Sequence, residues 1–177
     1  MQTWIALLRG INVGGRHTLP MKDLVEIFET AGGENVRTYI QSGNVVFSAN
    51  VDNLTAFGDT IGAVIEANHG FRPAIQLLTA ATLRAAIDAN PYPEAVDEPK
   101  FLHLAFLSEA PQPERIESAT KALADTERFT VIDKCLYMHT PDGLARSKFA
   151  ANVDKLLGVS ATARNWNTVT RLAEMAS

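Results

Sequence analysis

The sequence is poor in the residue types that support disulfide bonds, signal peptides and membrane spans. It has one cysteine, Cys135, so no disulfide can form within the chain, which favours a reducing compartment. No segment approaches the ~20 consecutive apolar residues of a membrane-spanning helix. The short apolar run at residues 4–8 leads into Arg9 rather than into a signal-peptide cleavage site. We therefore expect a cytoplasmic protein without a membrane partner.

Metal-binding and acid–base motifs are also scarce. The four histidines are scattered, and neither an H-x-x-x-H nor a C-x-x-C pattern occurs, which argues against a structural zinc site. Cys135 and His139 would lie ~13 Å apart on one strand, too far for a thiolate–imidazole pair. We therefore expect no metal and no cofactor, and the sequence identifies no catalytic residue.

Positive charge is scarce overall but is unevenly distributed. The formal net charge is −4, which argues against a protein that coats nucleic acid. Residues 88–127 contain nine acidic and three basic side chains, whereas residues 141–171 contain five basic and two acidic side chains. This asymmetry predicts a local surface that attracts anions near the C-terminus.

Apolar residues are abundant, at 46% of 177 residues, and their spacing predicts an α+β fold. The first half has the order β-α-β-β-α-β, which is the ferredoxin-like arrangement of an antiparallel sheet with two helices on one face. Its predicted strands are residues 2–8, 36–41, 45–48 and 73–78, and its helices begin at Pro20 and near residue 53 and end at glycines.

The second half repeats only part of this order. A strand at 101–107, a helix from Pro113 and a hairpin at 129–139 are predicted, and the remainder is expected to be helical or irregular. We therefore divide the chain into a ferredoxin-like half (1–90), an acidic, proline-containing connector (91–100) and a second α+β half with a helical C-terminus (101–177), packed as one compact unit.

Two loops in the first half carry candidate ligand-binding residues. The loop after the first strand contains Arg9 and Asn12, which offer hydrogen-bond donors, and the pair Gly14-Gly15, which allows a close backbone approach. The second candidate loop has polar side chains that can bind a ligand; it contains Ser42, Gly43 and Asn44. The alternatives are an ordinary strand-to-helix connection with Arg9 in an ion pair, and a tight hairpin turn.

Two further candidates lie in the second half. Arg146 and Lys148 flank Ser147 and can contact an oxyanion, or they can form a solvated helix start. Arg164, Asn165, Trp166 and Asn167 precede the last helix. In this segment Asn167 is expected to cap the helix, its free N–H groups and Arg164 to attract an anion, and Trp166 to stack on a base. The alternative is a core tryptophan between two capping asparagines.

These segments together resemble the family called domain of unknown function 1697. The resemblance rests on Arg-Gly-Ile-Asn-Val-Gly-Gly at 9–15, Pro-Met at 20–21, Leu24, 36–39 leading into 41–47, Arg-Ser-Lys-Phe at 146–149, and 162–168. It implies an α+β protein with a ferredoxin-like first half, from a mainly bacterial, cytoplasmic group. The segment 16–18 departs from the pattern, since more lysine would be expected there. The family has no established activity, so the resemblance implies no reaction.

Three functions stay open at this point. The four loops supply cations and amides with almost no carboxylates, which favours binding of a phosphate-bearing small molecule or a single-stranded nucleic acid. The second possibility is an enzyme on a phosphorylated or carboxylated small molecule, with Arg9 and Arg164 holding the anion and Ser42 or Ser147 acting in chemistry. The third is a protein–protein adaptor, in which the acidic segment 94–98 meets a basic partner of unknown identity.

Overall fold

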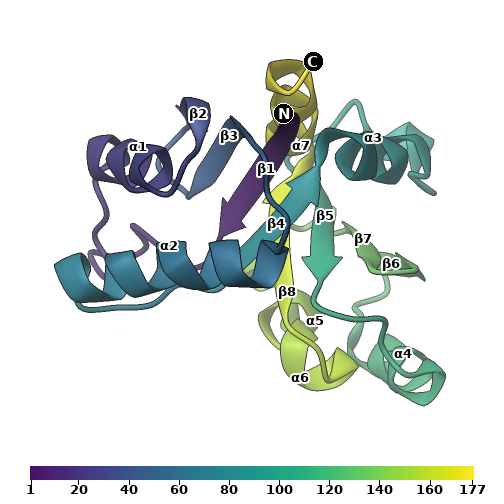
Figure 1. Ribbon diagram of the computed structural model, residues 1–177. Helices are drawn as coiled ribbons and strands as arrows, with labels where there is room; N and C mark the ends of the chain where they lie inside the picture. Colours follow the sequence, from purple (N-terminus) through teal and green to yellow (C-terminus); the bar gives the residue numbers. More distant parts are fainter. The chain divides into compact units, whose positions relative to one another are not determined.

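Two four-stranded antiparallel sheets organise the chain in the computed structural model, which describes residues 1–177 (Figure 1). The chain forms two compact units. The first consists of Met1–Arg84 together with Arg171–Ser177, and the second of Ala85–Thr170. The segment expected to be a connector, 91–100, lies inside the second unit, and the last seven residues belong to the first. The predicted α+β class is confirmed.

The first unit contains the predicted ferredoxin-like arrangement. Its strands stand in the order β2-β3-β1-β4, and each neighbouring pair is antiparallel. Helices α1 and α2 lie on one face of this sheet, and helix α3 follows β4 (Figure 1). The elements are β1 (Gln2–Leu8), α1 (Met21–Thr30), β2 (Glu34–Tyr39), β3 (Asn44–Ala49), α2 (Leu54–His69) and β4 (Ile75–Thr79). Helix α3 (Ala80–Asp88) begins in the first unit, and its residues from Ala85 onward belong to the second.

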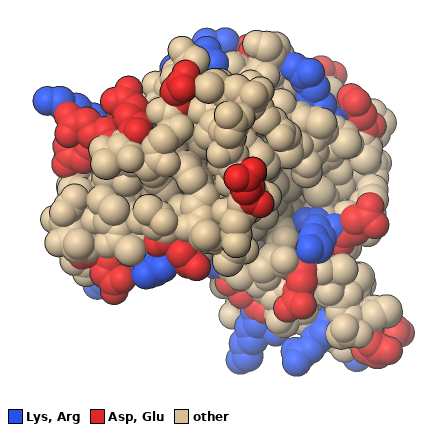
Figure 2. Space-filling model, viewed as in Figure 1, with Lys and Arg blue, Asp and Glu red and all other residues tan.

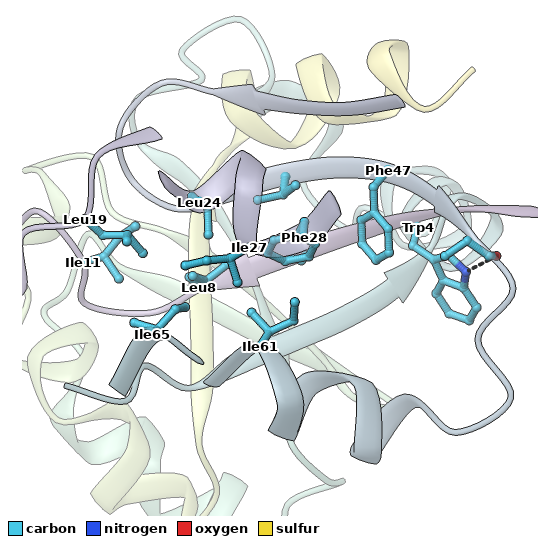
Figure 3. Packing of buried hydrophobic residues seen from close by; sticks show 13 residues of the cluster. Trp4, Leu8, Ile11, Leu19, Leu24, Ile27, Phe28, Phe47, Ile61 and Ile65 are labelled. Atoms are coloured by element: carbon cyan, nitrogen blue, oxygen red, sulfur yellow. Dashed lines mark hydrogen bonds between the residues drawn. The ribbon is translucent and has the colours of Figure 1, made fainter. Parts of the chain in front are cut away.

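The core of the first unit fills the space between this sheet and its two helices (Figure 3). Alternate side chains of β1, among them Trp4 and Leu8, point toward the helices, as the two-residue period of a strand requires. Phe28 of α1 meets Phe47 of β3 edge-on, with ring centroids 5.1 Å apart. The Trp4 Nε1–H donates to the Ala49 carbonyl at 3.3 Å, so the one polar group of this indole is satisfied.

Helix α2 begins and ends at the residues that its sequence predicts. The Asn53 side chain accepts a hydrogen bond from the Ala56 N–H at 3.0 Å, which satisfies one of the free donors of the first turn. Gly70 follows the helix in the left-handed conformation, with a φ of 76°, and its N–H donates to the Glu66 carbonyl.

The second unit has the same order of elements as the first, which corrects the expectation that it becomes helical or irregular after the hairpin. A fourth strand, β8, pairs with β5 and completes the order β6-β7-β5-β8. The elements are β5 (Leu102–Leu107), α4 (Pro113–Ala119), β6 (Arg128–Ile132), β7 (Cys135–His139), α5 (Lys148–Ala151), α6 (Val153–Leu157) and β8 (Ala161–Asn165), with 3₁₀ turns η1 (Pro93–Ala95), η2 (Thr120–Ala122) and η3 (Leu144–Arg146). Helix α7 (Trp166–Met175) begins in the second unit, and its residues from Arg171 onward belong to the first.

Arg128 of β6 binds the acidic segment before β5 to the sheet of the second unit. The Arg128 Nη2 donates to Glu94 Oε1 at 2.6 Å and lies 3.1 Å from the Nδ1 of His139. Its guanidinium also stacks over the Tyr92 ring at 4.7 Å. The hydrogen bond from Arg128 holds the pKa of the Glu94 carboxyl below its usual range.

None of the helices described above combines the length and the apolar character needed to cross a membrane.

Candidate functional site

The two candidate loops of the first unit are joined by the side chain of Asn12. Its Nδ2 donates to the Gln41 carbonyl at 2.8 Å and to the Leu19 carbonyl at 2.9 Å, and its Oδ1 accepts from the Leu19 N–H at 2.8 Å. Both ends of this amide are therefore used inside the protein. Asn12 fixes the relative position of the two loops.

We expect Asn12→Ala to lower the free energy of unfolding by about 2 kcal/mol, because it removes these hydrogen bonds and leaves backbone groups without partners. Urea unfolding is the appropriate measurement. Asn167→Ala is the matched control, since Asn167 is exposed and its side chain makes no hydrogen bond; its loss should stay within about 0.5 kcal/mol. Equal losses for the two variants would contradict the structural role of Asn12.

The tip of the first loop is a tight exposed turn. The Arg16 N–H donates to the Val13 carbonyl at 3.0 Å, and Gly14 and Gly15 between them have φ values of 58° and 73°. Two successive positive φ angles are the conformation that glycine adopts at least cost. Arg9 is exposed at the end of β1, and its N–H donates to the Ala74 carbonyl.

The second loop is packed against the first. Asn44 is fully buried, and its Nδ2 donates to the Tyr39 carbonyl at 3.1 Å and to Ser42 Oγ at 2.9 Å. The Gly43 carbonyl accepts from the Leu8 N–H at 2.7 Å. The polar groups of this turn hold the β2–β3 connection beside the end of β1.

In the second unit the predicted pair Arg146 and Lys148 lines a pocket of about 1040 Å³. The pocket lies among α4, η2, η3, α5 and α6. Five of its lining side chains are basic, namely Arg115, Lys121, Arg146, Lys148 and Lys155. Figure 2 shows Lys and Arg side chains gathered, with some acidic ones, at the lower edge of the view, where Figure 1 places α4 and α6. We call this the basic pocket.

Ser147 separates the two predicted basic residues and points inward. It is 3% exposed, and its Oγ accepts from the Ala150 N–H at 3.0 Å, so it caps α5. The hydroxyl is thus used by the helix, while Arg146 and Lys148 on either side are exposed and line the pocket.

Arg115 connects two walls of the basic pocket. Its Nη1 donates to the Lys155 carbonyl at 3.4 Å, close to the C-terminal end of α6, where free carbonyls attract a cation. Gly158, just after α6, adopts a left-handed φ of 73°, and its Cα side lies in ordinary van der Waals range of this guanidinium, since a Cβ there would be 3.6 Å from Arg115 Nε. The packing of α4 on α6 therefore places Arg115 in the basic pocket, although this residue comes from the acidic part of the sequence.

Two carboxylates also line the basic pocket. Glu114 is exposed, whereas Glu127 is 8% exposed and accepts a hydrogen bond from the Ala124 N–H at 3.0 Å. The remaining polar lining consists of Gln112, Ser118 and Asn152. No group of three or more His, Cys, Asp or Glu side chains anywhere in the chain is placed to hold a metal ion.

The fourth candidate segment lies in β8 and at the start of α7. Asn165, rather than Asn167, caps the last helix: its Oδ1 accepts from the Thr168 N–H at 2.9 Å, and α7 already begins at Trp166. The prediction that Asn167 is the cap is therefore wrong. Asn167 is exposed on the first turn, and Trp166 is 7% exposed.

Arg164 and Asn165 are consecutive residues of a strand, so their side chains point to opposite faces of the sheet. Arg164 is largely buried, its Nη1 donates to the Ala163 carbonyl at 2.9 Å, and burial lowers its pKa to about 10. Asn165 stands opposite His103 of β5.

The comparisons with known proteins agree with the α+β fold described above. Residues 1–137 match the family model described as protein of unknown function (DUF1697), so the chain belongs to this family. The family suggested by the sequence motifs is confirmed. Among solved structures, the conserved bacterial protein SP0830 from Streptococcus pneumoniae is similar, with a TM-score of 0.77, 18% identity and 99% of each chain covered. No curated protein matches.

Sequence reasoning identified Arg146 and Lys148 but not the other basic residues of the pocket. Arg115 and Lys121 lie in the acidic stretch of the chain, where isolated bases are typical of a solvated helix. Lys155 lies within the basic region 141–171, but no motif distinguishes it there. The two candidate loops of the first unit do not line this pocket.

Proposed function

We propose that this protein binds a phosphate-bearing ligand in the basic pocket of the second unit. The observation that carries the proposal is the convergence of five basic side chains from α4, η2, η3, α5 and α6 on one concave surface. Two carboxylates accompany them, and one of these, Glu127, is already engaged with a backbone N–H. Positive charge therefore exceeds negative charge around the pocket, although the whole chain is acidic.

The cations are available to a ligand. Lys121, Arg146 and Lys148 are exposed and form no salt bridge, and the same is true of Lys155. Like charges placed together repel one another, and an anion with several oxygens relieves that repulsion by accepting charge-assisted hydrogen bonds. Arg adds a planar fork that matches two phosphate oxygens.

Two other functions have less support. An enzyme that uses Ser147 requires its hydroxyl to reach a substrate, and this hydroxyl is buried and caps α5. A protein–protein adaptor that uses the acidic segment has to compete with the ion pair between Glu94 and Arg128. Neither is favoured by a specific observation.

The double variant Arg146→Glu with Lys148→Glu tests the proposal. For the wild type we expect millimolar inorganic phosphate or pyrophosphate to raise the midpoint of thermal unfolding, because a ligand at ~100 times its Kd stabilises the native state by ~2.7 kcal/mol. The double variant should lose this shift. Differential scanning calorimetry at constant ionic strength is the appropriate measurement.

Lys134→Glu serves as the matched control. Lys134 is exposed on the β6–β7 turn of the same unit and does not line the basic pocket. The control should retain the phosphate-induced shift. A wild type that responds to no phosphate compound, or a double variant that responds fully, would contradict the proposal.

A further inference from the structure

The cations of the basic pocket stand on two walls. Arg115 and Lys121 come from α4 and η2, whereas Arg146, Lys148 and Lys155 come from the segment η3–α6. The two walls meet where the Arg115 guanidinium reaches the Lys155 carbonyl at 3.4 Å. A ligand that satisfies both walls must present anionic groups in more than one direction.

The size of the pocket also favours a ligand with more than one anionic group. Its volume is about 1040 Å³, just above the roughly 300–1,000 Å³ typical of sites that bury a drug-sized molecule. One phosphate ion fills a small part of this space. It would occupy one wall and leave the cations of the other wall exposed to water.

The uncharged residues that line the pocket favour a ligand with an aliphatic, hydroxylated carbon skeleton and no aromatic ring. Ala122, Leu123 and Leu156 supply apolar surface, and Ser118 and Gln112 supply groups that hydrogen-bond to hydroxyls. No phenylalanine, tyrosine, tryptophan or histidine lines the pocket. Proteins that recognise nucleobases or single strands generally stack the base on such a ring.

We infer that the ligand of the basic pocket carries two or more spaced phosphate groups and no nucleobase. This inference rests on the proposed function and specifies its ligand class. A polyol or sugar bisphosphate and a short polyphosphate chain share this chemistry. One phosphate lies against Lys121 and Arg115, and the second against Arg146 and Lys148.

Isothermal titration calorimetry with five probes at one ionic strength tests the inference. The probes are inorganic phosphate, tripolyphosphate, fructose 1,6-bisphosphate, ATP and a ten-nucleotide oligothymidine. We expect tripolyphosphate or the bisphosphate to bind at least about tenfold more tightly than inorganic phosphate, a difference of ~1.4 kcal/mol. ATP should bind no more tightly than tripolyphosphate, since the base finds no stacking partner. The preference between tripolyphosphate and the bisphosphate distinguishes a phosphate chain from a phosphorylated carbon frame.

Three single variants separate the two walls. Lys121→Gln and Lys148→Gln each remove one cation from one wall, and Lys134→Gln removes an exposed cation outside the pocket. Each of the two wall variants should weaken binding of the preferred multi-phosphate probe about five- to tenfold. Binding of inorganic phosphate should be weakened by only one of the two variants. The control variant should bind every probe like the wild type.

The possible failures are distinguishable. Inorganic phosphate that binds as tightly as both multi-phosphate probes overturns this inference and leaves the proposed function standing. ATP or oligothymidine that binds about tenfold more tightly than tripolyphosphate also overturns it, because the base is then recognised. If none of the five probes binds, the proposed function is contradicted together with this inference.

Discussion

Gly43→Ala is expected to lower the free energy of unfolding by about 3 kcal/mol. A methyl group at this position would lie 2.7 Å from the Leu8 Cβ and 3.1 Å from the Ile11 Cδ1, inside a packed core where neighbouring groups have little room to move. Gly43 also has a φ of 81°, and a left-handed backbone costs a residue with a Cβ roughly 1–2 kcal/mol. Chemical denaturation monitored by tryptophan fluorescence measures the loss.

Gly14→Ala is the matched control for this prediction. Gly14 has a comparable φ of 58°, but a Cβ built on it meets no heavy atom within 4 Å. We expect a loss of about 1 kcal/mol, which is the backbone cost alone. The difference between the two variants isolates the contact of the β2–β3 turn with the end of β1. Losses of equal size would show that the close approach of Gly43 to Leu8 does not contribute to stability.

The second large effect is a loss of stability in acid that depends on His103. This side chain is 8% exposed, its Nδ1 has no hydrogen-bond partner, and burial lowers its pKa from 6.5 to about 4. Between these pH values the unfolded chain binds a proton that the folded chain does not. Stability therefore falls as the pH is lowered from about 6.5 to about 4, by a total of about 3 kcal/mol for this group.

His103→Leu should remove this contribution. Urea unfolding at intervals between pH 7 and pH 4 should give a smaller loss of stability for the variant than for the wild type. His17→Gln is the control, since His17 is exposed and belongs to the turn in the first unit. Burial and Arg128 also lower the pKa of His139, so part of the pH dependence should persist in the variant. Parallel pH profiles for the wild type and His103→Leu would refute the assignment.

Most of the first unit could be predicted from local signals. Helix α2 shows why: its apolar stripe, its cap at Asn53 and its end at Gly70 all follow from residues close together in the chain. Strand β8 could not be predicted in this way. Its sequence, Ala-Thr-Ala-Arg-Asn, has little preference for a strand, and it becomes one because β5 offers an unpaired edge.

The candidate site could be predicted only in part, for the same reason. Arg146 and Lys148 lie two residues apart, so their closeness in space follows from the short distance along the chain. Arg115 lies forty residues before Lys155, and only the packing of α4 on α6 brings it to the pocket. In the first unit, the residue types chosen for ligand binding, asparagine and glycine, are also those that close turns. Asn12 is used there for the contact between the two loops, and Gly43 for the contact of the second loop with the end of β1.

The assignment of the last seven residues to the first unit has a consequence for synthesis on the ribosome. Arg37 donates to the Met175 carbonyl at 2.5 Å and Arg84 donates to Ser177 Oγ at 2.8 Å, so the first unit acquires these contacts only after residues 171–177 have been synthesised. At about 5–20 residues per second, the ribosome needs roughly 4–17 s to translate Ala85–Thr170. During that interval the nascent first unit has all four of its strands but lacks the segment Arg171–Ser177.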